Sequence, residues 1–143
     1  KDFSDSDFSG MVTDIKTAVK YLTENTKADS KKIGLIGASI GSNSSLRVLA
    51  DNASIKTAVA LSPGLDYHRV TTDDAVKKVA DRPMYLIAAE GDKYSAESVN
   101  KLYELNKKQV TKEIISGDKH GVPMFETKPE LKTKVVNWFK DKL

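Results

Sequence analysis

A serine between two glycines, the pattern G-x-S-x-G at residues 37–41, is the first feature of the sequence that could carry out chemistry. The apolar run 33–37 before it predicts a buried strand, and residues 40–50 predict a helix. A serine on the sharp turn between them projects its hydroxyl above the sheet, and a glycine on each side avoids steric clash. The N–H of Ile40 can then bind the oxyanion of a tetrahedral intermediate. The alternative is that Ser39 only caps the helix.

A serine nucleophile needs a base, and the sequence contains only two histidines. His120 lies in the loop 117–121, which follows a predicted strand on the side of the sheet where Ser39 emerges. We therefore expect His120 to take the proton of the serine. His68 follows another predicted strand and could flank the pocket, but an ordinary surface position is the simpler explanation for this residue.

A carboxylate that orients the histidine is also expected after a strand, and Asp92 comes directly after the apolar run 84–89. An acid at this place can accept the imidazole Nδ1–H and stabilise the imidazolium. These residue types together predict covalent acyl transfer, without any metal or cofactor. Three other acids remain open as alternatives, each of which could instead be a solvated loop residue: Asp66, Glu90 and Asp118.

Apolar side chains follow His120 and offer a candidate acyl pocket. Val122, Met124 and Phe125 either line such a pocket or pack in the core under the last helix, and the sequence favours neither interpretation.

Helical and apolar patterns alternate along the chain. The apolar face of the first helix contains Met11, Ile15 and Leu22, and Ser9 or Asp7 could cap its start. Strands separated by crossover helices pair in parallel, so we predict a doubly wound α/β sheet of at least four strands in a single domain, 1–143. The expected helices are 8–25, 40–50, 72–80, 96–107 and 129–143, and the expected strands are 33–37, 57–61, 84–89 and 111–116.

Composition excludes several classes of protein. The 143 residues are 39% hydrophobic and 30% charged, which is typical of a soluble globular protein, and no apolar run is long enough to span a bilayer. The net charge of +3 is spread along the chain, which argues against nucleic-acid binding. The absence of cysteine excludes disulfides, thiolate metal sites and a cysteine nucleophile, but leaves the compartment open, with the cytoplasm slightly favoured.

The candidate residues occur in the order serine, aspartate, histidine, which is the order associated with α/β-hydrolases. From residue 8 to residue 143 the chain resembles the C-terminal half of an α/β-hydrolase of the dienelactone hydrolase-like or small serine esterase type. The resemblance implies a serine hydrolase that cleaves small carboxylic esters with Ser39, His120 and Asp92 through an acyl-enzyme. It is carried by the segments IGLIGASIGSNSSLR, ALSPGLDY, MYLIAAEGDKYSA and SGDKHGVPMF.

The chain departs from the family pattern in two ways. Dienelactone hydrolases proper carry cysteine as the nucleophile, so Ser39 indicates the esterase-like branch. The family also has about four strands before the nucleophile, and a loop among them supplies the second oxyanion N–H. Without these strands, the strand 33–37 becomes an apolar sheet edge that invites association. We therefore expect a piece of a longer polypeptide, or a chain that pairs this edge with another copy.

Two other functions remain to be weighed. A hydrolase-like domain without activity could bind a ligand or a partner, but the presence of all three residue types in order argues against it. An unrelated module could hold a phosphate at the helix that begins at Ile40. The glycine spacing fits neither the dinucleotide-binding fingerprint nor a P-loop, so this interpretation has no further support.

Overall fold

Four parallel strands form the central sheet in the computed structural model, which describes residues 3–143. In spatial order they are β1 (Ile33–Ala38), β2 (Ile55–Leu61), β5 (Met84–Ala89) and β6 (Val110–Ile115). Residues at their C-terminal ends pair across the sheet, Ala38 with Leu61 and Ala89 with Ile115. The segments that follow the four strands therefore meet at one edge, where ligands bind in sheets of this kind.

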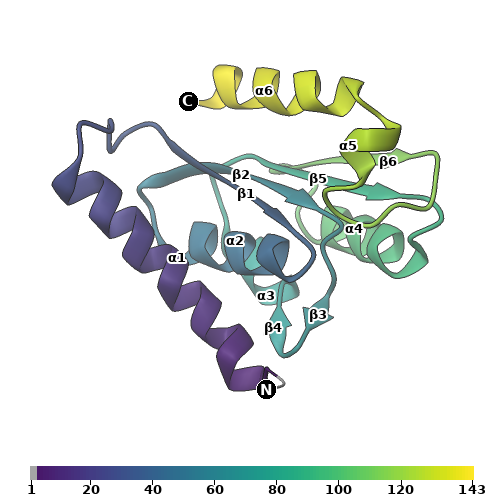
Figure 1. Ribbon diagram of the computed structural model, residues 1–143, viewed down its shortest axis with the longest axis horizontal. Helices are drawn as coiled ribbons and strands as arrows, with labels where there is room; N and C mark the ends of the chain where they lie inside the picture. The colour runs from purple at the N-terminus through teal and green to yellow at the C-terminus, as the bar shows by residue number, and fades with distance from the viewer. Residues whose placement is uncertain (1–2) are drawn as a thin grey trace.

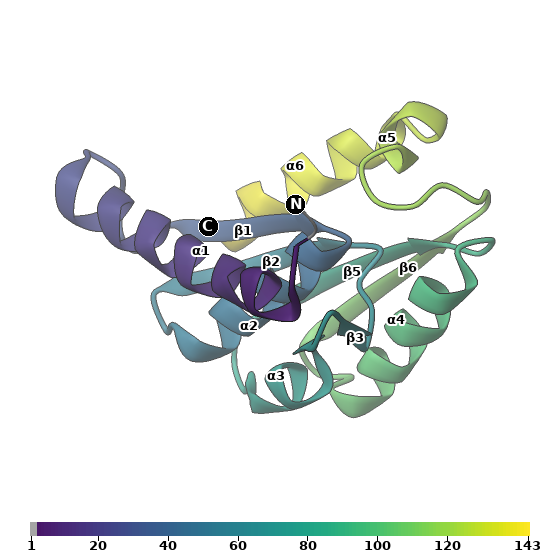
Figure 2. The same cartoon turned by 60° about the horizontal axis from the view of Figure 1, so that its bottom comes forward.

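Helices cover both faces of the sheet, which confirms the predicted doubly wound α/β architecture (Figures 1 and 2). Helices α2, α3 and α4 lie on one face, and α1 packs against α2 beside the β1 edge. Helices α5 and α6 lie on the other face. Their bounds are α1 (Asp5–Asn25), α2 (Ile40–Asp51), α3 (Asp73–Lys78), α4 (Lys93–Leu105), α5 (Met124–Thr127) and α6 (Glu130–Lys142).

Alternate residues of the inner strands pack into two separate cores. Ala58 and Ala60 of β2 belong to the cluster under α2, α3 and α4, whereas Val59 and Leu61 face α6. All six residues of β5 are buried, as expected for a strand covered on both faces. The edge strand β1 is covered less completely, as the 50% exposure of its Ile36 side chain shows.

The first helix begins earlier than its apolar pattern predicts. Ser4 is the N-cap, and its side chain accepts the N–H of Asp7 while the Asp7 carboxylate accepts the N–H of Ser4, which forms a capping box. The prediction that Ser9 or Asp7 caps the helix is therefore wrong. The Ser9 hydroxyl instead donates to the carbonyl of Asp5 within the first turns.

A small antiparallel hairpin, β3 (Asp66–Tyr67) and β4 (Val70–Thr71), occupies part of the stretch after β2 where the sequence predicts only one helix. The two turn residues, His68 and Arg69, both have positive φ, 50° and 64°. Turns of this geometry favour Asn-Gly, so His-Arg gives no sequence signal for a hairpin. The predicted helix 72–80 forms only as the six residues of α3.

A buried asparagine fastens this hairpin to α2. The Asn43 side chain donates to the carbonyl of Val70 at 2.7 Å and accepts the N–H of Gly64 at 3.0 Å. One turn later, Arg47 donates to the carbonyl of Thr71 at 3.0 Å. The helix that follows Ser39 therefore also fixes the loop that follows β2.

None of the helices in residues 3–143 is long and apolar enough to cross a membrane.

We predict that Asn43→Ala lowers the free energy of unfolding by about 2–4 kcal/mol, because it leaves a buried N–H and a buried carbonyl without partners. Urea denaturation measures this difference. Asn100→Ala is the matched control, since Asn100 is exposed and its side-chain partner is the flexible Lys112. If Asn43→Ala loses no more unfolding free energy than Asn100→Ala, the proposal that Asn43 anchors the hairpin is contradicted.

Candidate active site

Ser39 lies on a strained turn between β1 and α2. Its φ of 54° and ψ of −128° place a residue other than glycine in a sparsely populated conformation, which is typical of functional sites. The Ser39 N–H donates to the carbonyl of Leu61 at 2.9 Å, so pairing with β2 continues into the turn. The side chain makes no capping hydrogen bond to α2, which disfavours the alternative that Ser39 serves as a helix cap.

The two glycines around Ser39 differ in their importance. A Cβ on Gly37 would overlap the backbone of Gly41 and lie 2.7 Å from the N atom of Ser42, so only glycine fits there. A Cβ on Gly41 would meet nothing within 4 Å. The expected clash is therefore present at Gly37, where only glycine fits. At Gly41 the described residues show no such clash, so this part of the expectation is wrong.

Ile40 is the first residue of α2. The N–H groups of the first turn have no partner in the i→i−4 pattern of a helix, and they lie at its positive end. The Ile40 N–H therefore has the position expected of an oxyanion donor next to Ser39. Its side chain is half-buried.

Asp92 and His120 are in direct contact. The Nδ1 atom of His120 lies 2.7 Å from Oδ2 of Asp92, and the side chains are 42% and 14% exposed. An ionised carboxylate only accepts, so Nδ1 carries the proton and Nε2 is left to act as a base. The pair joins the loop after β5 to the loop after β6.

A glycine brings these two loops together. The N–H of Gly91 donates to the carbonyl of Gly117 at 2.8 Å, and a Cβ on Gly91 would lie only 2.8 Å from that carbonyl oxygen. The Glu90 N–H donates to the carbonyl of Ile115, also at 2.8 Å, which continues the pairing of β5 with β6. This close approach of the backbones lets Asp92 reach the histidine.

The other candidate acids have different positions. Asp66 accepts the N–H of Arg69 at 2.7 Å within the hairpin turn. The Asp118 side chain is 80% exposed and lies 3.8 Å from Lys119. Glu90 is exposed. Of the four candidate acids, only Asp92 makes a hydrogen bond with His120.

The loop that carries His120 is anchored next to Ser39. A Cβ on Gly121 would lie 3.4 Å from Cβ of Ala38, so the residue after His120 is close to the residue before Ser39. No hydrogen bond joins the Ser39 hydroxyl to His120 in residues 3–143. Such contacts are often long in enzymes without substrate and shorten when substrate binds.

Ser62, which the sequence analysis missed, holds this loop in place. Its fully buried hydroxyl accepts the N–H of Gly121 at 2.9 Å, and its φ is 50°. Ser62 follows β2 directly, and its own N–H donates to the carbonyl of Ile87 at 2.7 Å. A serine after a strand, in the ALSPG segment, is the only signal that could have identified it.

Tyr67 packs beside the histidine and was also missed. Its ring meets the His120 ring edge-on at 6.2 Å between centroids, and its hydroxyl is 3.0 Å from Oγ of Ser95. Burial raises the pKa of the Tyr67 phenol, so the group stays neutral. Tyr67 therefore packs beside His120 as a neutral group.

His68 is turned toward α1. Its ring stacks on Phe8 at 4.0 Å between centroids, and Nδ1 lies 3.5 Å from Asp5. The side chain is 55% exposed. His68 thus joins the hairpin to the start of α1 and has no contact with His120.

The three apolar residues after His120 have three different environments. Met124 is fully buried in the core under α6, so of the two interpretations left open for it, core packing is the correct one. Phe125 is partly buried and packs against the same core. Val122 is 58% exposed. The structure therefore provides no shared acyl pocket from these side chains.

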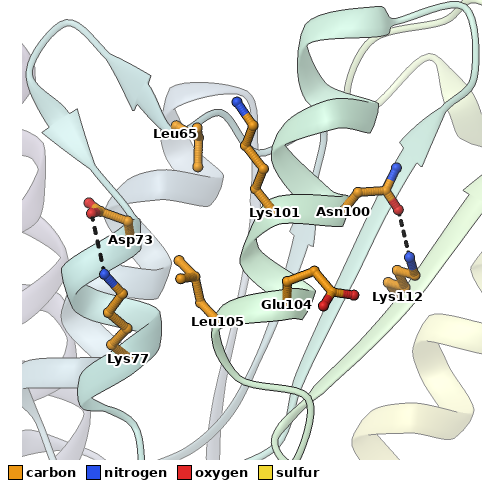
Figure 3. A pocket seen from close by; sticks show the side chains of 8 residues that line it. All are labelled: Leu65, Asp73, Lys77, Asn100, Lys101, Glu104, Leu105 and Lys112. Atoms are coloured by element: carbon orange, nitrogen blue, oxygen red, sulfur yellow. Dashed lines mark hydrogen bonds and ion pairs between the residues drawn. The ribbon is translucent and has the colours of Figure 1, made fainter.

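A hollow of about 650 Å³ lies between α3, α4 and β6, but it has no part in this site (Figure 3). Long charged side chains form much of its wall, and Lys112 donates to Asn100 at 2.6 Å there. Neither Ser39 nor His120 lines it. Residues 3–143 also contain no cluster of three or more side chains that could hold a metal ion.

The family model for the dienelactone hydrolase family matches residues 3–136. The chain belongs to this family. No curated protein sequence matches it significantly. The family assignment confirms the suspected resemblance to α/β-hydrolases, and the chain order of the candidate residues agrees with that fold.

Solved structures share the fold of this dienelactone hydrolase family member. An esterase from Pyrococcus furiosus is similar over 91% of this chain and 60% of its own, with a TM-score of 0.78 and 23% identity. The α/β hydrolase GrgF from Penicillium is similar over 94% and 72%, with a TM-score of 0.80 and 14% identity. Dipeptidyl peptidase 4 from Porphyromonas gingivalis is similar over 92% and 22%, with a TM-score of 0.74 and 17% identity. The chain therefore spans about three fifths of the length of the Pyrococcus esterase.

We predict that Ser62→Ala and Ser62→Gly both weaken the contact between His120 and Asp92, because both remove the acceptor of the Gly121 N–H. Glycine tolerates positive φ, so Ser62→Gly should be more stable than Ser62→Ala by about 1 kcal/mol. The downfield proton signal of the His120 Nδ1–H, measured by NMR, should broaden in both variants. A native signal in Ser62→Gly would mean that Ser62 acts on stability alone.

Proposed function

We propose that the protein is a serine hydrolase that cleaves small carboxylic esters through an acyl-enzyme. The observation that carries this proposal is the 2.7 Å contact between His120 and Asp92 at the sheet edge where the strained Ser39 also lies. A paired histidine and carboxylate at the same strand ends as a serine is the arrangement that activates a hydroxyl. Membership of the dienelactone hydrolase family and the fold shared with a Pyrococcus esterase support the same reaction class.

In the first half of the reaction, the Ser39 hydroxyl attacks the ester carbonyl while Nε2 of His120 takes its proton. Asp92 holds the imidazole through Nδ1–H and stabilises the imidazolium. The Ile40 N–H donates to the oxyanion of the tetrahedral intermediate. The intermediate collapses when His120 returns the proton to the leaving alcohol, and the acyl group stays on Ser39.

In the second half, water replaces the alcohol. His120 takes a proton from the water, which attacks the acyl-enzyme carbonyl, and the same N–H of Ile40 stabilises the second oxyanion. Proton return to Oγ of Ser39 releases the carboxylic acid. No step needs a metal or a redox cofactor, and the products are the alcohol and the carboxylic acid.

A fluorophosphonate probe tests the nucleophile without a choice of substrate. We expect intact-mass analysis of the natural polypeptide that contains this chain to show one adduct, and Ser39→Ala to show none. Ser44→Ala is the control, because Ser44 is buried one turn further along α2. An unlabelled native protein would contradict the proposal and favour a hydrolase-like domain that only binds a ligand.

Asp92→Asn tests the orienting role separately. The amide of the substituted side chain would donate a hydrogen bond to Nδ1 of His120, where the carboxylate accepts one. This favours the tautomer of His120 that carries its proton on Nε2, and a protonated Nε2 cannot act as a base. We expect kcat on a p-nitrophenyl ester to fall by roughly three to four orders of magnitude. Asp118→Asn should keep kcat within about twofold, because an exposed loop charge contributes little. Equal effects of the two substitutions would refute the assignment of Asp92.

A further inference from the structure

Hydrogen bonds join the hairpin after β2 to the first two turns of α4. The Tyr94 hydroxyl donates to the carbonyl of Asp66 at 2.9 Å and accepts the N–H of the same residue at 3.0 Å. The Leu65 N–H donates to Oγ of Ser98 at 3.1 Å. Asp92 is the N-cap of α4, so the hairpin is fastened to the helix that begins directly after the proposed orienting acid.

The Tyr67 side chain extends from this hairpin and contacts the segments that follow three different strands. Its hydroxyl lies 3.0 Å from Oγ of Ser95, a fully buried residue in the first turn of α4. The same hydroxyl lies 3.4 Å from the carbonyl of Ser62, which directly follows β2. The Tyr67 ring meets the His120 ring, in the loop after β6, at an angle of 85°. One side chain therefore links the loops that carry the candidate acid and the candidate base.

One assignment of protons satisfies both contacts of the Tyr67 hydroxyl. A carbonyl only accepts, so the Tyr67 O–H donates to the carbonyl of Ser62 in a long hydrogen bond. The Ser95 O–H then donates to the Tyr67 oxygen. Burial raises the pKa of the Tyr67 phenol, and the nearby charge of Asp92 acts in the same direction. The phenol therefore keeps the proton that this arrangement needs.

Close packing also confines the Tyr67 ring. A Cβ on Gly64 would lie 2.8 Å from ring atoms of both Tyr67 and Tyr94, so the two rings pack directly on the backbone there. They meet each other at 66°, with centroids 5.6 Å apart. The Tyr67 ring thus has Tyr94 and the backbone of Gly64 as neighbours besides His120, and its hydroxyl is held at the far end.

We propose that Tyr67 is a positioning residue that holds the His120 imidazole against Asp92. Its hydroxyl is fixed by the helix that begins after Asp92, and its ring in turn fixes the orientation of the histidine. Without the hydroxyl the ring can shift, and the Nδ1–H of His120 loses its alignment with the carboxylate. The effect on catalysis rests on the proposed serine hydrolase activity, whereas the geometry of the pair can be measured without it.

Two conservative substitutions test this role in the natural polypeptide that contains the chain. Tyr67→Phe keeps the ring and removes the hydroxyl, and Ser95→Ala removes its partner. We expect each to lower kcat for p-nitrophenyl acetate about five- to tenfold and to change KM less than about twofold, because misalignment of the base slows the chemical step. Tyr103→Phe is the matched control with native kcat, since Tyr103 lies further along α4 with its ring against Lys112. A change in KM alone would mean that Tyr67 binds substrate, and would overturn the positioning role.

The double variant distinguishes a shared link from two independent effects. Because the two hydroxyls bond to each other, Tyr67→Phe combined with Ser95→Ala should lower kcat no more than the stronger single substitution does. The double variant also leaves neither hydroxyl of the pair buried without its partner, so it guards against a loss of folding in the single variants. Effects that multiply would contradict the proposal.

The downfield proton signal of the His120 Nδ1–H reports the contact with Asp92 without any reaction. Tyr67→Phe should broaden this signal or move it upfield, and Tyr103→Phe should leave it native. A variant that is only less stable would keep the native signal at temperatures below its unfolding transition. A native signal in Tyr67→Phe is therefore the result that would refute the positioning role.

The hydrolase activity and the positioning role fail differently. A native protein that fluorophosphonate does not label, with the proton signal disturbed in Tyr67→Phe, would refute the hydrolase and retain the role of Tyr67. Labelling at Ser39, together with a native signal and native kcat in Tyr67→Phe, would refute only the role of Tyr67.

Discussion

The parallel register of the four strands is the constraint on which the candidate site depends. Ala38 pairs with Leu61 and Ala89 with Ile115, so the chain leaves all four strands along one edge. Ser39, Asp92 and His120 each lie in a segment that begins there. A shift of one residue in any pair would turn the alternate side chains to the wrong core and carry the following loop away from its neighbours.

The parts of the fold that depend on periodicity could be predicted from the sequence. The six apolar residues of β5 and the helical spacing of α6 identify buried elements because burial imposes a repeat. Its place directly after a strand also favoured Asp92 as the partner of His120, and the structure shows this contact, although three other acids had remained open. These inferences hold because the C-terminal ends of parallel strands meet at one edge of the sheet. A residue that directly follows such a strand can therefore be placed at this edge from the sequence.

Features that depend on local backbone geometry or on long-range contacts could not be predicted. The hairpin turn at His68 and Arg69 places two consecutive residues other than glycine at positive φ, which is uncommon. Ser62 resembles any polar residue after a strand until its hydroxyl meets the N–H of Gly121, 59 positions later in the chain. Met124 was ambiguous for a similar reason, since an apolar side chain lines a pocket or fills a core according to what packs against it.

Helix α1 is attached to the molecule far more loosely than its length implies. Of its 21 residues only Val19 is buried, whereas the shorter α2 buries eight. Helices with few buried contacts open in local fluctuations that leave the rest of the domain folded. Amide hydrogens of α1 should therefore exchange with solvent before those of the sheet. Heating would therefore disorder α1 while the contact between His120 and Asp92 survives, so that this helix melts before cooperative unfolding begins.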